Sequence, residues 1–366
     1  MKLPTIDDLL KDNQQWNIYD FPLDQHLFVA GPPGSGKTSL AVHRAKLLAA
    51  AKKSVVLLTK NRMLASLAGQ LGLEAFNTST MHSYVASQYH MVANANVPQV
   101  AAYDWDWISI GQAYRGRGFA ATLDHLIVDE GQNLPSAFYG WAVEFGAKNL
   151  SVFADEDQTT NAQRASLDQI VQAGLPNPIR LLHNHRNSDE IARVAEHFHR
   201  SRTLAPGIVR RGRTGDVPEL VSVKSWDELV TRVKNRHQNR PGSIGVVVHQ
   251  KLDAASVAEK LKAALPVDAR IDVYTSDMPP GAEKEIRSLE EGVTVLTGES
   301  VIGMEFDTVY LHDLNRSLPC GSVEEFRRMY MLCARARDSL TLVNGPVALS
   351  AVQIADLPPE PILSRR

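Results

Sequence analysis

The segment Gly31-Pro-Pro-Gly-Ser-Gly-Lys37-Thr38 restricts the fold more than any other feature of the chain. It follows the apolar run His26–Ala30 and precedes a helical stretch over Ser39–Ala51, the strand–loop–helix context in which a P-loop forms. There, backbone N–H groups surround phosphate oxygens, the lysine reaches the β- and γ-phosphates, and the hydroxyl side chain binds Mg²⁺. The segment predicts a nucleoside triphosphate site, with Thr38 as a metal ligand. The candidate binding residues are Gly31, Pro32, Gly34, Ser35, Gly36, Lys37 and Thr38.

Short apolar runs alternate with helical stretches along the whole chain. The runs are four to six residues long and rich in Val, Ile and Leu, which is typical of parallel strands covered by helices on both faces. Pro176 and Pro178 interrupt this pattern, so we predict two α/β domains, residues 1–178 and 179–366, with a small insertion at about 83–123. The predicted strands are His26–Ala30, Ser54–Leu58, His125–Val128, Leu150–Ala154, Ile179–Leu182, Ser243–Val248, Ile271–Tyr274, Val293–Leu296, Thr308–Leu311 and Leu340–Val343.

Composition excludes several classes of protein. With 44% hydrophobic and 22% charged residues, the 366-residue chain has average globular composition, and it has no apolar run long enough to span a membrane. Two cysteines and a polar, acidic N-terminal segment indicate a soluble, cytoplasmic protein. The net charge of −2 predicts that any site for a polyanion is a local groove.

The apolar run His125–Val128 ends in two carboxylates, Asp129 and Glu130. Together with a P-loop, this pattern predicts that Asp129 holds Mg²⁺ and that Glu130 orients or deprotonates the water that attacks the γ-phosphate. A base beside the metal ligand favours hydrolysis over switch-like binding.

Two further motifs complete a nucleotide site in the first domain. Asp129-Glu-Gly-Gln132 is similar to a D-E-x-Q box, and Val152–Gln158 is similar to a G-D-x-x-Q box. Their order resembles that of the superfamily 1 helicases of the UvrD/Rep type, from about Gln14 to Val343. The resemblance implies two tandem RecA-like P-loop NTPase domains, with ATP and Mg²⁺ bound. It also implies that Gln158 senses the γ-phosphate and that Gln14 or Gln15 contacts adenine, Gln15 being our candidate.

The second domain carries three motifs of the same family. They are Asn184-His-Arg-Asn187, similar to N-Y-R-S, Gly303–Asp307, similar to K-G-L-E-F, and Tyr330–Arg337, similar to Y-V-A-L-T-R-A-K. The resemblance implies that Arg186 and Arg335 act on the γ-phosphate, that His185 faces the adenine, and that Gly303 and Glu305 belong to the nucleotide site.

The helix after Ser322 supports one of these arginines independently. Ser322 and Glu325 form a predicted capping box, and the spacing places one buried stripe along the helix. We expect Arg335 on a different face, directed into a cleft between the domains. The predicted stripe is Val323, Phe326, Tyr330 and Cys333.

Nucleic-acid contacts are predicted after the second strand and in a T-x-H-S box. These positions supply Thr59, Lys60, Thr80 and His82 as candidates. Trp105 and Trp107 either stack on bases or pack in the interior. The arginines around a Pro-Gly turn form either a phosphate track or a solvated hairpin, namely Arg200, Arg202, Arg210, Arg211 and Arg213.

The chain departs from the family pattern mainly in the nucleic-acid contacts. The aromatic residues expected after Gln158 are replaced by Asn161 and Gln163, and there is little room for the accessory domains of family helicases. The motifs of the second domain differ at Ile302 (usually lysine), Glu299 (histidine), Ala334 (threonine) and His185 (tyrosine). We therefore expect weak strand separation or none.

Two functional hypotheses remain open at this point. The first is an ATP-dependent helicase or translocase on single-stranded nucleic acid, for which DNA is the first candidate and RNA remains open. The alternative is a regulatory helicase-like ATPase subunit that controls a nuclease or other effector in a bacterial defence or mobile-element system. A P-loop kinase explains neither Gln158 nor the two arginines.

Overall fold

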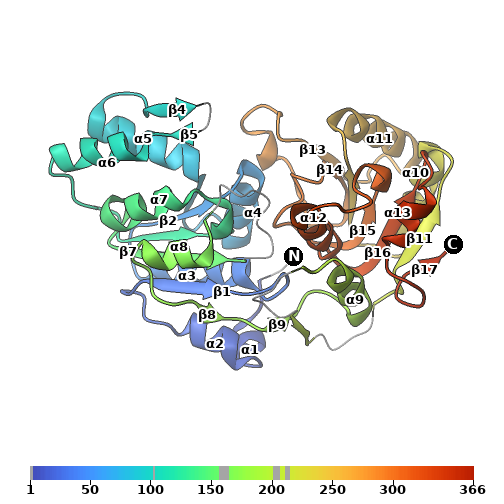
Figure 1. Ribbon diagram of the computed structural model, residues 1–366, viewed down its shortest axis with the longest axis horizontal. Helices are drawn as coiled ribbons and strands as arrows, with labels where there is room; N and C mark the ends of the chain where they lie inside the picture. The colour runs from blue at the N-terminus through green and yellow to red at the C-terminus, as the bar shows by residue number, and fades with distance from the viewer. Residues whose placement is uncertain (1–2, 102–103, 156–164, 201–206, 211–214) are drawn as a thin grey trace. The chain divides into compact units, whose positions relative to one another are not determined.

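The computed structural model describes residues 3–101, 104–155, 165–200, 207–210 and 215–366 (Figure 1). These residues divide into two compact units. The N-terminal unit comprises residues 3–32 and 36–182, and the C-terminal unit comprises residues 33–35 and 183–366. The division thus falls four residues beyond the predicted domain boundary.

The N-terminal unit is built on a six-stranded parallel sheet with the strand order β3-β2-β6-β7-β1-β8. After β1 the chain crosses over to β2, beyond β7 and β6, so loops from several strands meet at the carboxyl edge of the sheet. The strands are β1 (Leu27–Ala30), β2 (Val55–Thr59), β3 (Asn77–Thr80), β6 (His125–Val128), β7 (Asn149–Ala154) and β8 (Ile179–Arg180).

Both faces of this sheet are buried. Alternate strand residues such as Phe28, Leu58 and Val128 join one apolar cluster with the helices α5 to α8. The residues between them, such as Val29 and Leu57, are equally buried, and helix α3 packs against β2, β6 and β7. The helices are α1 (Ile6–Leu9), α2 (Asn13–Tyr19), α3 (Lys37–Ala50), α4 (Arg62–Gly72), α5 (Met81–Ala93), α6 (Trp107–Gly116), α7 (Ser136–Trp141) and α8 (Leu167–Gln172).

The predicted insertion forms a small substructure at one end of this unit. Helices α5 and α6 and the hairpin of β4 (Gln99–Ala101) and β5 (Asp104–Trp105) lie together there (Figure 1). Trp105 is buried and Trp107 is half-buried among aromatic neighbours. The structure therefore favours the packed alternative for both tryptophans over base stacking.

The C-terminal unit contains a seven-stranded sheet in which every pair is parallel, with the order β13-β14-β12-β15-β16-β11-β17. A cluster of Val, Ile, Leu and Ala side chains joins it to α10 and α11. The strands are β11 (Glu219–Ser222), β12 (Ser243–Val248), β13 (Ile271–Tyr274), β14 (Gly292–Thr297), β15 (Phe306–Leu311), β16 (Ala336–Asn344) and β17 (Ser364–Arg365), besides the short pair β9 (His183–Asn184) and β10 (Ile208–Val209). The helices are α9 (Asp189–His197), α10 (Trp226–Asn239), α11 (Lys251–Ala264), α12 (Val323–Cys333) and α13 (Ala351–Ala355).

The predicted fold class, mixed α/β with parallel sheets of the RecA-like P-loop type, is confirmed. Each predicted run contains or overlaps a strand, and Ser322 and Glu325 form the predicted capping box. Ile179–Arg180 pairs with β1 and so completes the first sheet. In the part of the chain that the structure describes, no helix has the length and apolar character needed to cross a bilayer.

The prediction for the helix after Ser322 was wrong in two respects. Helix α12 ends at Cys333, so Arg335 follows the helix instead of lying on one of its faces. Val323 is 46% exposed, whereas the whole last part of the helix is buried. The last turn of α12 lies in the interior just before β16 begins, so all of its side chains are buried. This tertiary packing, and not the helical spacing of apolar residues, determines which side chains are buried.

We expect Gly245→Ala to destabilise the C-terminal unit. A Cβ at Gly245, in the interior strand β12, would lie 2.6 Å from the ring of Phe306, which is fully buried. The expected loss is about 1–3 kcal/mol of unfolding free energy, measured by urea denaturation. Gly140→Ala is the control, because nothing lies within 4 Å of its Cβ and alanine favours the helix. Equal stability of the two variants would contradict the prediction.

Candidate active site

The P-loop connects β1 to α3 with two glycines in the left-handed region. Gly34 has φ +77° and Gly36 has φ +89°, values that a residue with a Cβ rarely adopts. Lys37 is buried at the start of α3, and its Nζ donates to the carbonyl oxygens of Gly31 at 2.6 Å and Pro32 at 2.9 Å. The loop therefore closes around its own lysine, and the ammonium lies at the concave side of the backbone.

Asp155 is a site residue to which the sequence assigned no role. It directly follows β7, is fully buried, and its Oδ2 lies 3.4 Å from Lys37 Nζ. The signal was available, since β7 was predicted and a carboxylate directly after it must lie at the carboxyl edge. What the sequence left open was the order of the strands, which sets β7 beside β1.

Asp129 and Thr38, the two predicted metal ligands, lie in contact. Thr38 Oγ1 donates to Asp129 Oδ2 at 2.8 Å, while Asp129 Oδ1 is buried without a hydrogen-bond partner among the described residues. Burial, together with the neighbouring charge of Glu130, holds the pKa of Asp129 well above its usual range. An orphaned carboxylate oxygen beside a hydroxyl is a donor set that fits Mg²⁺.

Glu130 lies in a network of hydrogen bonds at the carboxyl end of β6. Gln132 Nε2 donates to Glu130 Oε2 at 2.6 Å, and Gln132 Oε1 accepts from the backbone N–H of Asp155 at 2.9 Å. The backbone of Glu130 has φ +55°, a strained conformation for a residue with a side chain. The side-chain amide of Gln132 thus connects Glu130, the candidate base, to Asp155 at the end of β7.

The structure distinguishes between the two candidate adenine-binding glutamines. Gln15, on α2, is buried, and a Cβ on Gly36 would lie 2.6 Å from its Nε2. Gln14 instead accepts the backbone N–H of Leu182 through its Oε1 at 2.8 Å. Gln15 is therefore the one beside the P-loop.

In the C-terminal unit, Asn184–Asn187 forms a compact turn against residues 33–35, which belong to the same unit. The N–H of His185 donates to the carbonyl of Gly34 at 2.9 Å, and a Cβ on Gly34 would lie 2.2 Å from Asn184 Oδ1. Arg186 Nε donates to Glu305 Oε2 at 2.5 Å, with both side chains 11% exposed. Burial opposes ionisation of Glu305, but Arg186 holds the pKa of that carboxyl below its usual range.

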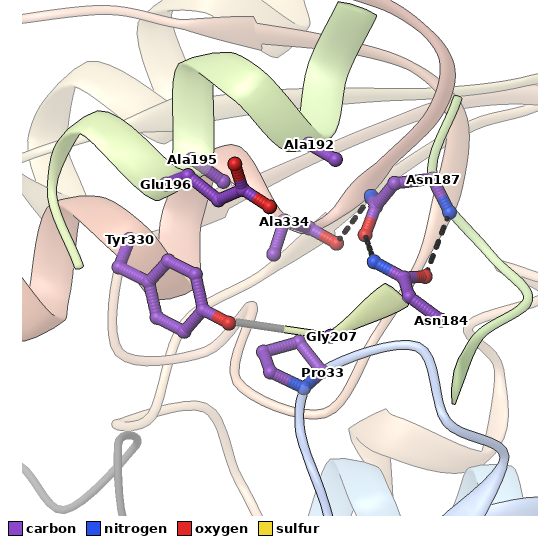
Figure 2. A pocket seen from close by; sticks show the side chains of 9 residues that line it. All are labelled: Pro33, Asn184, Asn187, Ala192, Ala195, Glu196, Gly207, Tyr330 and Ala334. Carbon is purple, nitrogen blue, oxygen red and sulfur yellow. Dashed lines mark hydrogen bonds between the residues drawn. The ribbon is translucent and has the colours of Figure 1, made fainter. Parts of the chain in front are cut away.

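Asn187 fastens this turn to the end of α12. Its Nδ2 donates to the carbonyl oxygens of Ala334 and Ala336, and its Oδ1 accepts from Asn184 Nδ2 at 2.8 Å. Figure 2 shows the bonds of Asn187 to Ala334 and Asn184 at the rim of a pocket that Glu196 and Tyr330 line from the other side. The turn is thereby held by backbone carbonyls of another motif.

Arg335 is 1% exposed and bound to backbone. Its Nε donates to the carbonyl of Met331 at 2.9 Å, and its Nη1 donates to the carbonyl of Met304 at 3.3 Å. Arg335 thus joins the end of α12 to the segment that contains Gly303 and Glu305. Gly303 has φ +80°.

Gln158, the predicted γ-phosphate sensor, lies outside the described residues.

The candidates for nucleic-acid binding lie at the ends of β2 and β3. Lys60 is half-buried, and Thr80 caps α5, accepting the N–H of Ser83 at 3.3 Å. His82 contacts the ring of Trp105 edge-on, with centroids 4.9 Å apart. Thr59 differs from the expectation, since it is fully buried and its hydroxyl donates to the carbonyl of Asn61 at 2.9 Å.

The arginines around the Pro-Gly turn are only partly described. Arg200 lies over the ring of Phe326 at 3.9 Å and donates to the carbonyls of His197 and His199. The backbone N–H of Arg210 donates to the carbonyl of Asn184 at 2.9 Å. Arg202, Arg211 and Arg213 lie outside the described residues.

Fold and site together define a P-loop nucleotide-binding protein of the α/β class. Residues 18–164 match a family model described as an AAA domain. The chain is also similar to the crystal structure of the C-terminal domain of a possible DNA helicase from Lactobacillus plantarum. The sequence identity is 18% and the TM-score 0.36, over 50% of this chain and 98% of that chain. Comparison with curated proteins finds none that matches.

The family match covers the P-loop, both carboxylates after β6 and Asp155. It supports a P-loop ATPase domain over these residues.

We expect Asp129→Asn to weaken Mg²⁺-dependent nucleotide binding. The amide keeps the size of the side chain but removes the charge that a divalent cation requires. Titration of a fluorescent ATP analogue with and without Mg²⁺ measures the effect. The wild type should bind at least about tenfold more tightly with Mg²⁺, and the variant should lose most of this difference. Asp124→Asn is the control, because Asp124 lies at the opposite edge of the sheet, before β6. An unchanged response to Mg²⁺ would exclude Asp129 as a ligand.

Proposed function

We propose that the protein is an ATP-hydrolysing translocase of the superfamily 1 helicase type that acts on single-stranded DNA. The observation that carries the proposal is the carboxyl edge of the N-terminal sheet. At this edge, the residues after β1, β6 and β7 form the proposed nucleotide site. The residues after the neighbouring strands β2 and β3 supply polar and basic groups that have no role in nucleotide chemistry.

Each group in the nucleotide set has a definite task in this proposal. Lys37 binds the β- and γ-phosphates, and Thr38 and Asp129 would hold Mg²⁺, which neutralises phosphate charge when bound. Glu130 orients the attacking water and accepts its proton, and Gln132 fixes the direction of the Glu130 carboxylate. Gln15 contacts the adenine, and Gln158 senses the γ-phosphate.

The C-terminal unit supplies the positive charges that stabilise the transferred phosphoryl group. Arg186 is held by a carboxylate and Arg335 by two backbone carbonyls, so both guanidinium groups are fixed before any nucleotide binds. Because Arg186 is already oriented, it needs little reorganisation as the reaction proceeds, whereas the almost fully buried Arg335 must first be uncovered. His185 contacts the adenine, and Gly303 and Glu305 hold the segment to which both arginines bind.

The DNA site is formed by two helix N-termini. Asn61 caps α4 after β2, and Thr80 caps α5 after β3, so the positive ends of two helix dipoles lie on adjacent strands. Lys60 adds an ammonium group beside them. Such groups bind phosphates of the DNA backbone, which gives affinity without sequence preference.

Steady-state ATP hydrolysis at low salt, with and without single-stranded DNA and RNA oligonucleotides, tests the proposal. Stimulation by DNA is the expected result. Stimulation by RNA alone would contradict DNA as the substrate and indicate single-stranded RNA in its place. Hydrolysis that responds to neither would contradict a translocase and favour a regulatory ATPase subunit with an effector protein as its partner.

Glu130→Gln should abolish hydrolysis while ATP binding remains, because the amide keeps the bond pattern but cannot accept a proton. Turnover should fall by at least about 10²-fold, with the affinity for ATP within a few-fold of the wild type. Glu144→Gln is the control, since Glu144 is exposed and pairs with Arg115. Normal turnover by the Glu130 variant would remove Glu130 from the role of base.

Arg186→Ala should lower the kcat for ATP by about 10³-fold or more, with a much smaller change in affinity. Its guanidinium is needed when charge develops on the phosphoryl group. Arg193→Ala, on the exposed face of α9, is the control. Since the variant leaves Glu305 buried without its arginine, Arg186→Ala with Glu305→Gln separates the catalytic effect from misfolding. An equal loss in kcat and affinity would place Arg186 in binding alone.

A further inference from the structure

The 3-10 turn η1 (Gly131–Asn133) after Glu130 leaves the side chain of Asn133 in an unusual state. The side chain is fully buried, and its Nδ2 has no hydrogen-bond partner among the described residues. Its Oδ1 accepts from Lys60 Nζ at 3.5 Å. A buried amide with an unused donor lowers stability relative to an apolar side chain of the same size. Packing alone would therefore favour an apolar side chain at this position. The hydrogen bond from Lys60 is the interaction that an asparagine provides and an apolar residue would not.

The same turn is bonded to the candidate base. The backbone N–H of Asn133 donates to the carbonyl of Glu130 at 2.9 Å, and Gln132 binds the Glu130 carboxylate and the N–H of Asp155. One face of the turn thus reaches the nucleotide residues. The other reaches Lys60, at the end of the strand next to β6.

The turn is also held firmly from the core. Tyr139 OH donates to the carbonyl of Gly131 at 2.6 Å, and a Cβ on Gly131 would lie 2.7 Å from both Tyr139 OH and Val152 Cγ1. With Gly131 fixed on that side, a displacement at Asn133 is passed along the turn to Gln132 and Glu130. The close packing around Gly131 leaves no space in which the turn could adjust locally instead.

We propose that Asn133 is a positioning residue that couples DNA binding at Lys60 to the placement of Glu130. When a DNA phosphate binds the ammonium of Lys60, the hydrogen bond from Lys60 to Asn133 Oδ1 is lost. The turn then shifts, and the Glu130 carboxylate moves into the position needed for hydrolysis. The inference rests on the proposed function and names how that function is regulated.

The test is the mutual effect of nucleotide and DNA on binding, because such coupling is reciprocal. A fluorescently labelled oligo-dT is titrated with the full chain, with and without a non-hydrolysable ATP analogue. In the wild type the analogue should change the Kd for oligo-dT by at least about fivefold. In Asn133→Leu the change should fall below about twofold, and stimulation of ATP hydrolysis by oligo-dT should be lost, while hydrolysis without DNA remains. Asn77→Ala is the matched control, because Asn77 is exposed at the far end of β3.

Three further measurements separate coupling from stability. Asn133→Leu should unfold at the same temperature as the wild type or higher, since leucine leaves no unused donor. Asn133→Asp keeps the size of the side chain and holds Lys60 with a full charge, so the Kd for oligo-dT should rise at least about fivefold. With Lys60→Ala in the background, Asn133→Leu should have no additional effect on the coupling.

The outcomes are distinct. Coupling in Asn133→Leu equal to that of the wild type, or normal binding of oligo-dT by Asn133→Asp, overturns the inference and leaves the proposed function standing. A wild type whose hydrolysis and oligo-dT affinity show no mutual effect overturns both.

Discussion

The burial of charged side chains at one edge of a parallel sheet is the constraint on which the nucleotide site depends. β6, β7 and β1 are neighbours, so the residues after them, Asp129, Asp155 and the P-loop, must meet. Among the described residues, the buried carboxylates of Asp129, Glu130 and Asp155 lie there with the buried ammonium of Lys37. Burial, and after it the charge of Glu130, raises the pKa of Asp129, and a bound divalent cation would favour the ionised carboxylate.

The residues that we propose bind nucleotide and those that we propose bind DNA follow adjacent strands, so coupling between them needs no long pathway. The N–H of Asp129 donates to the carbonyl of Leu58 at 2.9 Å, two residues before Lys60. The proposed metal ligand Asp129 and the proposed DNA contact Lys60 therefore follow two strands that pair directly, about 4.8 Å apart. A single short turn between Glu130 and Asn133 is then sufficient to join the two sites.

The sequence predicted the parts of this arrangement that local chemistry determines. The P-loop, the strand that ends in Asp129 and the capping box at Ser322 depend on residues within a few positions of one another. It did not predict β3, Asn77–Thr80, because those residues are polar and the strand forms through its pairing with β2. Likewise the role of Asp155 depends on the order of strands, and the burial of Arg335 depends on where α12 ends. These features arise from tertiary contacts, which periodicity does not contain.

The two arginines of the C-terminal unit that we propose act on the γ-phosphate are held by different interactions. Arg186 is bound by a carboxylate, so an incoming phosphate must compete with a full negative charge. Arg335 is bound by neutral carbonyls, so the competing interaction is weaker, but the side chain is almost fully buried and must be uncovered before it can reach a ligand. One arginine is restrained by charge and the other by burial. A nucleotide that engages both must therefore bring negative charge and also favour a rearrangement around the end of α12.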